Sequence, residues 1–260
     1  MPVSLPGRSQ SIDARVIATT KEMPHEFAFN KDMGGGDVLG LGWTQSSIGG
    51  GKRSSSATTY LAAAINRPNV HVLINAQVTK LLHTGSIGTV PSFRAVQFAR
   101  KPGGRSTLNV NATLLISDQL YIVPLTVVKA RKEIILSAGS FGTPQILLLS
   151  GIGPKTELQA LNIPVVVNNP SVGRNLSDHI YVPNIYKVRD EDSLDNFFRD
   201  PLRFSSAMKE WHAGKTGILA GGISNNLGFF RLSSNASIFS TTRDPASGAS
   251  AAHWEMVVAV

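Results

Sequence analysis

The chain has 260 residues, a formal net charge of +8 and no cysteine. This length allows one large domain or two modest ones, and the missing cysteines exclude disulfides, thiolate metal sites and cysteine nucleophiles. The basic residues are scattered, with no cluster longer than a pair such as Lys52-Arg53, so no nucleic-acid partner is expected. No apolar run is long enough to span a bilayer, which needs about 18 residues, so no membrane partner is expected. The first residues, 1–6, also lack the charged and apolar regions of a signal peptide.

The first 70 residues contain two predicted helices separated by a glycine-rich stretch. Apolar residues at helical spacing predict a helix over 11–22. Residues 34–51 carry two glycine triplets around a short apolar run, which is typical of a loop around a strand. Three serines at 54–56 are candidate caps for a second helix through 59–65.

The next part of the chain alternates apolar and polar residues in the manner of β-strands. This alternation predicts a strand over 70–82 with an antiparallel partner over 93–99. A turn is expected at Gly103-Gly104, and a further short strand is expected at 108–110.

A short apolar strand over 132–139 is predicted to lead into a helix. Thr143 is the expected cap of that helix and Pro144 its first helical residue, because proline suits this position. Gly151 is expected to end the helix. The composition changes near Val182-Pro183, which predicts a domain boundary there.

Three familiar ligand-binding motifs are absent from the sequence. Gly51-Lys52 is followed by Arg53 rather than serine or threonine, so it does not form a Walker phosphate loop. No Gly-x-Gly-x-x-Gly fingerprint follows a predicted strand. The six histidines have no metal-ligand spacing, so no metal site is expected.

Gly139 to Gly153 is the most informative stretch. It reads Gly-Ser-Phe-Gly-Thr-Pro-Gln-Ile-Leu-Leu-Leu-Ser-Gly-Ile-Gly. Small residues that precede a helix let a ligand approach the backbone, and helix N-terminal amides favour an anion. The residues alone therefore predict a nucleotide-like site.

This stretch closely resembles the second signature of the glucose-methanol-choline flavoenzymes. The resemblance extends over nearly the whole chain, and it is similar to aryl-alcohol oxidase in particular. The segments that carry it further are Leu41–Ser46, Val172–His179, Asp195–Arg199 and His253–Glu255.

The resemblance implies an α/β fold. Residues 1–180 would form part of a Rossmann-like FAD-binding domain, and residues 181–260 would begin an α+β substrate-binding domain. The implied activity is oxidation of the CH–OH group of aromatic or other primary alcohols to aldehydes, with O2 as acceptor. The implied partners are a small-molecule alcohol and O2.

The same resemblance assigns cofactor-binding residues. Val78 corresponds to a strand valine whose backbone contacts the FAD adenine. Ser137, Ala138 and Gly139 correspond to a turn beside the ADP half of FAD. Asp178 and His179 belong to a block near the cofactor, without an assigned contact.

The chain departs from the family pattern in ways that bear on activity. Threonine replaces an aromatic residue of the access loop in the segment Ser240-Thr241-Thr242-Arg243. The catalytic histidine of the family corresponds to a position beyond Val260, and the glycine fingerprint to one before Met1, so no catalytic residue is assigned. The alternative interpretation is therefore an internal, catalytically inactive fragment of such an enzyme.

Two sequons are candidate N-glycosylation sites. They are Asn175-Leu176-Ser177 and Asn235-Ala236-Ser237. Together with the resemblance to secreted fungal oxidases, they predict that the parent protein is a secreted glycoprotein.

Residues 113–130 are predicted to be a non-native insertion, the translation of an unspliced intron. The run is apolar and has no counterpart in the family. A genuine additional hairpin with Pro124 near its turn is the alternative.

Overall fold

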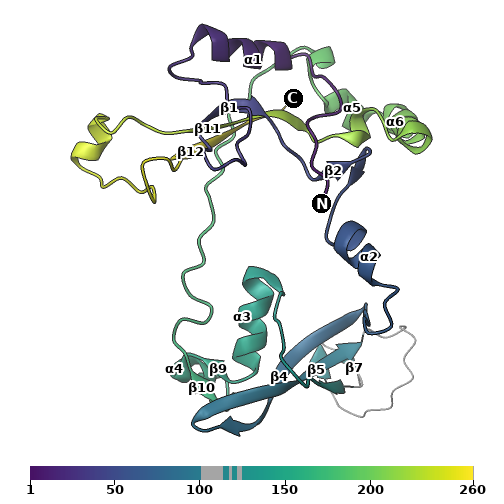
Figure 1. Ribbon diagram of the computed structural model, residues 1–260, viewed down its shortest axis with the longest axis vertical. Helices are drawn as coiled ribbons and strands as arrows, with labels where there is room; N and C mark the ends of the chain where they lie inside the picture. Colours follow the sequence, from purple (N-terminus) through teal and green to yellow (C-terminus); the bar gives the residue numbers. More distant parts are fainter. Residues whose placement is uncertain (101–113, 117–118, 122–124, 260) are drawn as a thin grey trace. The chain divides into compact units, whose positions relative to one another are not determined.

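The computed structural model describes residues 1–100, 114–116, 119–121 and 125–259 (Figure 1). The chain divides into two compact units, each of which contains a three-stranded antiparallel sheet. Unit 1 consists of Met1–Val70 and Asn184–Val260, and unit 2 consists of His71–Pro183. The expected turn at Gly103-Gly104 and strand at 108–110 lie outside the described residues.

Unit 1 combines a sheet in the order β1-β11-β12 with short helices. Strands β11 and β12 pair in antiparallel register, with Phe230 opposite Trp254. The helices and strands of this unit are α1 (Asp13–Glu22), β1 (Gly40–Trp43), β2 (Ile48–Gly49), β3 (Lys52–Arg53), the π-helix η1 (Ala57–Leu61), α2 (Ala62–Ala64), the 3-10 helix η2 (Asp190–Asp192), α5 (Asp195–Arg199), α6 (Pro201–Gly214), the 3-10 helix η3 (Ile218–Ala220), β11 (Ser224–Phe230), the 3-10 helix η4 (Ser237–Ser240) and β12 (Trp254–Ala259).

The core of unit 1 includes buried polar groups beside its apolar side chains. Leu41 and Phe230 of the sheet are buried. Asp13 of α1 is also buried. The Asn225 amide donates a 2.8 Å hydrogen bond to Asp13 Oδ2 and so joins β11 to α1. Buried polar side chains need such partners, because an unpaired buried group costs about 1–3 kcal/mol.

Unit 2 combines a sheet in the order β4-β5-β8 with two helices. Figure 1 shows α3 standing beside β4. The helices and strands of this unit are β4 (Ala76–Ile87), β5 (Val90–Arg100), β6 (Leu114–Ile116), β7 (Gln119–Tyr121), β8 (Leu125–Lys129), α3 (Gly139–Leu149), β9 (Ile152–Gly153), α4 (Lys155–Ala160) and β10 (Val167–Asn168).

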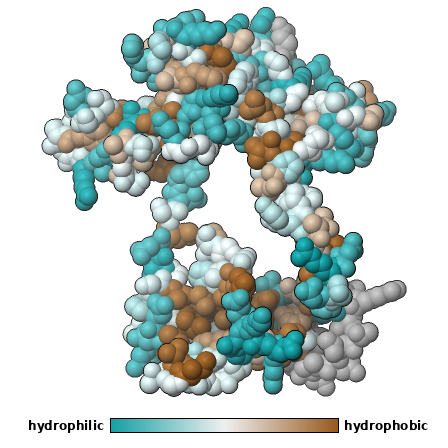
Figure 2. Space-filling model, viewed as in Figure 1, coloured by the Kyte–Doolittle hydropathy of each residue, from teal (hydrophilic) through white to brown (hydrophobic). Residues whose placement is uncertain are grey.

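The core of unit 2 lies between the sheet and α3. Leu81, Phe98 and Ile146 are buried there. Figure 2 shows that hydrophobic side chains also reach the surface of this unit, and Ile135 and Phe141 are among the exposed ones.

Several sequence predictions are confirmed and two are wrong. The helix over 11–22 and the antiparallel pair of strands are present as α1 and as β4 with β5. The strand predicted over 132–139 is wrong: residues 133–137 lie in neither a helix nor a strand, and Ile135 is 77% exposed. A strand needs a neighbour to satisfy its peptide groups, which local sequence does not supply.

The helix that follows starts earlier than predicted. It begins at Gly139, which has a φ of 79°, and Pro144 lies inside it. The Thr143 hydroxyl does not cap the helix at the predicted position; it accepts a 3.1 Å hydrogen bond from the Ala138 amide.

Candidate functional site

The four predicted cofactor residues all lie in unit 2, on two different elements. Val78 is on β4, and Ser137, Ala138 and Gly139 form the turn that leads into α3. The turn follows the irregular segment 131–136 and is exposed.

The start of α3 offers backbone donors and open space. Ala138 occupies the N-cap position without a side-chain capping bond to the helix. The first amides of any α-helix lack partners within the helix and carry partial positive charge. A Cβ atom placed on Gly139 would meet no other atom within 4 Å. These features fit the approach of an anionic group such as a phosphate.

Val78 lies on an edge strand beside an irregularity in the sheet. It is half-buried and pairs with Phe98 of β5, and the register shifts between Val78 and Lys80. Thr79 stabilises the shift because its hydroxyl donates to the main-chain oxygen of Gln97 at 3.2 Å. Since β4 is at the edge of its sheet, peptide groups on its open side have no strand partner among the described residues. A backbone contact to a ligand is therefore chemically feasible at β4.

No hydrogen bond among the described residues joins the turn of Ser137, Ala138 and Gly139 to Val78. The hydrogen bond that ties α3 to β4 is at the C-terminal end of the helix, where the Leu81 amide donates to the Ser150 hydroxyl at 2.7 Å. A helix of this length extends about 16 Å at 1.5 Å per residue, so Gly139 stands about that far from the bond to β4.

Asp178 and His179 do not join either element. Both are exposed, and the His179 amide donates to the Asp178 carboxylate at 2.9 Å. This local bond shapes the chain and gives neither side chain a place in a site.

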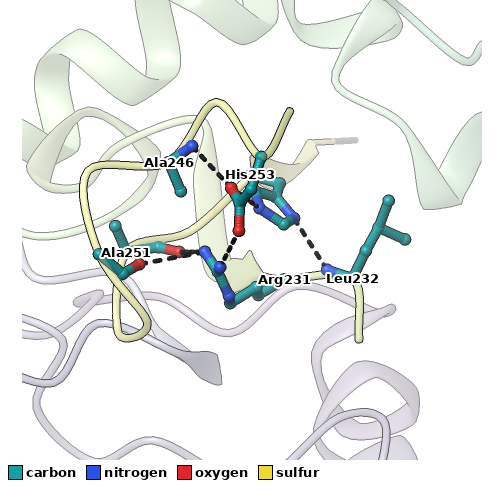
Figure 3. Close-up of polar contacts among 7 residues, drawn as sticks. Arg231, Leu232, Ala246, Ala251 and His253 are labelled. Carbon is teal, nitrogen blue, oxygen red and sulfur yellow. Dashed lines mark hydrogen bonds and ion pairs between the residues drawn. The ribbon is translucent and has the colours of Figure 1, made fainter. Parts of the chain in front are cut away.

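A second polar cluster, not predicted from the sequence, closes the loop between β11 and β12 in unit 1 (Figure 3). We call Arg231, Asp244 and His253 the neck cluster. Arg231 forms an ion pair with Asp244, and its Nη1 donates to the main-chain oxygens of Gly248 at 3.1 Å and Ala251 at 2.8 Å.

Both nitrogens of His253 are engaged in this cluster. The Leu232 amide donates to His253 Nδ1 at 3.0 Å, and Nε2 lies 3.0 Å from Asp244 Oδ1. A main-chain amide can only donate, so Nδ1 is the acceptor and Nε2 carries the proton that Asp244 accepts. The side chain of His253 is only 9% exposed.

The pKa of Asp244 is held below its ordinary value by these neighbours. The largest cause is the hydrogen bond from the Ala246 amide, followed by the hydrogen bond from His253, and the charge of Arg231 adds to them. Each of these partners favours the ionised carboxylate.

Unit 1 also has an open, polar cleft of about 640 Å³. Its lining includes Arg8, Arg203, Glu210 and Phe197. None of the predicted site residues lies in it.

Over the residues that the structure describes, no helix has the length and apolar character to cross a membrane, and no cluster of metal-ligating side chains is present.

Comparison with known proteins identifies the family. Residues 8–181 match the family GMC oxidoreductase. The chain belongs to the GMC oxidoreductase family. The α/β class expected from the sequence is thereby confirmed, in agreement with the mixture of helices and strands.

A curated relative and two solved structures match most of the chain. Pyranose dehydrogenase 3 of Leucoagaricus meleagris is 37% identical over 247 residues, which are 94% of this chain and 36% of that protein. The chain thus spans about a third of the length of this curated relative.

Two solved structures have the same fold. An FAD-dependent oxidoreductase from Chaetomium thermophilum matches with a TM-score of 0.64 and 26% identity, over 88% of this chain and 36% of that one. A fungal aryl-alcohol oxidase matches with a TM-score of 0.63 and 21% identity, over 87% of this chain and 35% of that one. At that identity the second match shows the fold alone.

The sequence assigns no role to Asp244 or His253; His253 lies in a segment that resembles the family. Their association with Arg231 depends on the pairing of β11 with β12, which places Phe230 opposite Trp254. Spacing along the chain contains no signal for it.

Proposed function

We propose that this chain forms part of an FAD-dependent oxidoreductase that oxidises the CH–OH group of a small-molecule alcohol. The observation that carries the proposal is the exposed turn before α3, with unpaired helix amides and open space beside Gly139, in a chain of the GMC oxidoreductase family. A turn of this kind suits the phosphate groups of a dinucleotide.

The residues of this chain would bind and orient the cofactor. Ser137, Ala138 and Gly139 would lie beside the ADP half, with the first amides of α3 as donors, and the backbone of Val78 on the edge strand would contact the adenine. The chemistry that FAD would supply is acceptance of a hydride from the carbon that carries the hydroxyl group. No side chain of this chain is assigned the removal of the hydroxyl proton.

Two substrate classes are supported by different observations. The resemblance to aryl-alcohol oxidase favours an aromatic or other primary alcohol, with O2 reduced to hydrogen peroxide. The 37% identical relative is named pyranose dehydrogenase, which favours a sugar. The polar segment Ser240–Arg243, where aryl-alcohol oxidases carry an aromatic residue, also favours a hydroxyl-rich substrate.

The proposal extends to localisation. A secreted parent would carry glycans at Asn175 and Asn235, and both residues are exposed in their units. Exposure leaves room for a glycan on the folded protein.

Flavin reduction tests the proposal. Native protein isolated from its source and loaded with FAD would be mixed without oxygen with benzyl alcohol, and separately with D-glucose. Loss of the oxidised flavin absorbance with either alcohol supports the proposed reaction, and the preferred alcohol distinguishes the two classes. Readmission of air followed by a peroxide assay tests O2 as the acceptor. A flavin that stays oxidised with both alcohols and with other primary alcohols would contradict the proposal.

A further inference from the structure

The open cleft of unit 1 has no part in the proposed function. Its volume of about 640 Å³ is within the range of small-molecule sites, about 300–1,000 Å³. The lining comes from the N-terminal segment at Gly7 and Arg8, from η2 and α5, and from α6 with the short helix η3 that follows it. Helices α5 and α6 lie side by side (Figure 1). None of the residues proposed to bind FAD lines this cleft.

A small pocket adjoins the cleft and contains a buried acceptor without a partner. It shares Arg8, Leu194 and Ile218 with the cleft, and its volume of about 10 Å³ is room for one small polar group. Gln10 also lines it. The amide nitrogen of Gln10 donates to the Ile223 oxygen at 3.1 Å, whereas the buried Oε1 accepts no hydrogen bond among the described residues. An unpaired buried acceptor costs free energy, so a ligand that brings a donor to it gains affinity.

The cleft also carries opposite charges that are not paired with each other. Arg8, Asp190 and Glu210 line it and are exposed, and none of the three side chains has an ion-pair partner among the described residues. Arg203, the other cation of the lining, already pairs with Asp200 at 3.5 Å. An anion alone would leave the carboxylates without a partner, and a neutral ligand would leave both kinds of charge unpaired. The cleft therefore fits a ligand that carries both signs.

The wall that carries Arg8 is held in place before any ligand binds. The buried Asn225 donates from its side-chain amide to the Arg8 main-chain oxygen at 2.7 Å. The main-chain amide of Gln10 donates to Asp13 Oδ2, also at 2.7 Å. A wall that is ordered in advance loses less conformational entropy on binding, which favours affinity.

We propose that this cleft binds a small zwitterion, an α-amino acid with an apolar side chain. Arg8 pairs with the carboxylate of the ligand. Glu210 and Gln10 Oε1 accept from its ammonium group, which has three donors. Phe197 and Ile218, both half-buried in the lining, give the side chain of the ligand an apolar surface.

Calorimetric titration of the native, FAD-loaded protein measures this binding without turnover. The probe is L-leucine. 4-Methylpentanoate keeps its carboxylate and side chain but lacks the ammonium group, and 3-methylbutylamine keeps the ammonium group and side chain but lacks the carboxylate. Each analogue should bind about tenfold more weakly than L-leucine, or less, because one charge of the cleft stays unpaired.

Two variants separate the roles of the two charges. Arg8→Gln and Glu210→Gln should each weaken the binding of L-leucine by about tenfold or more. Arg8→Gln should leave the binding of 3-methylbutylamine unchanged, and Glu210→Gln should leave that of 4-methylpentanoate unchanged. A misfolded variant would not give this crossed pattern. The matched control is Lys209→Gln, which removes an exposed charge of α6 outside the lining and should bind L-leucine as the wild type does.

Three results would overturn the inference. The first is L-leucine that does not bind at millimolar concentration. The second is L-leucine that binds no better than both analogues. The third is wild-type affinity for L-leucine in Arg8→Gln and Glu210→Gln. The titration contains no alcohol and the flavin stays oxidised throughout, so its outcome is independent of the proposed redox reaction.

Discussion

The Asp244 carboxylate of the neck cluster links the stability of the fold to pH. The Ala246 amide, the His253 ring and the Arg231 charge lower the pKa of Asp244 in the folded protein, below the value of about 4 in the unfolded chain. A group with a lowered folded pKa stabilises the fold above its unfolded pKa, and this contribution is lost as the pH falls through the folded pKa.

We therefore expect the free energy of unfolding to decrease as the pH is lowered from about 5 to below 4, where carboxylates protonate. Asp244→Asn should make this decrease smaller. It should not abolish it, because Asp192 also has a lowered pKa, caused first by a hydrogen bond from Ser11 and next by one from Arg189. Urea unfolding at a series of pH values measures the effect. An unchanged pH dependence in Asp244→Asn would contradict the assignment.

At the scale of elements, the sequence predicts those helices and strands whose pattern lies within one short stretch of the chain. Alternation over 93–99 was sufficient to predict β5, and helical spacing was sufficient to predict α1. The strand predicted over 132–139 failed because a strand depends on a neighbour elsewhere in the chain. The neck cluster was missed for the same reason, since its members are separated in sequence and meet only after β11 pairs with β12.

One side chain joins the two principal elements of unit 2. The buried Ser150 hydroxyl donates to the Ile146 oxygen at 2.5 Å and accepts from the Leu81 amide at 2.7 Å. Ser150→Ala would leave the Leu81 amide buried without a partner, which costs about 1–3 kcal/mol. We expect Ser150→Ala to lower the midpoint of urea unfolding. The control is Ser86→Ala, a change at an exposed residue of β4, the strand that carries Leu81. Equal midpoints for the two variants would show that the bond does not stabilise the unit.

At the scale of the whole molecule, the cofactor contacts proposed for this chain are few and separated. They comprise one exposed turn and one edge strand, and the sequence has no Gly-x-Gly-x-x-Gly fingerprint to hold a pyrophosphate. We therefore expect the 260-residue chain, produced alone and purified, to be colourless. Flavin absorbance equivalent to about one FAD per chain would show that these contacts are sufficient to retain the cofactor and that the expectation is wrong.

The segment 113–130 supplies the third strand of the sheet of unit 2. Strand β8 (Leu125–Lys129) lies inside it and pairs with β5, while Val128 is 54% exposed. Strands β6 and β7 pair as a hairpin, which is what the alternative of a genuine insertion requires, although they are joined before Pro124 rather than near it. Splicing would remove all three strands.

We predict that the mature transcript lacks these codons. An ACG codon for Thr113 before a leucine codon that starts with T provides a GT donor, and an AGA or AGG codon for Arg131 provides the AG acceptor. The removed length is a multiple of three, so the frame is kept and the joined protein reads Asn-Ala-Thr-Lys-Glu-Ile-Ile-Leu. An exposed apolar strand such as β8 is an aggregation hazard that the shorter protein avoids. We therefore expect the spliced form to stay soluble at concentrations at which the 260-residue form precipitates, with sequencing of the transcript as the direct measurement. Mature message that retains the codons would establish β6, β7 and β8 as native strands of this protein.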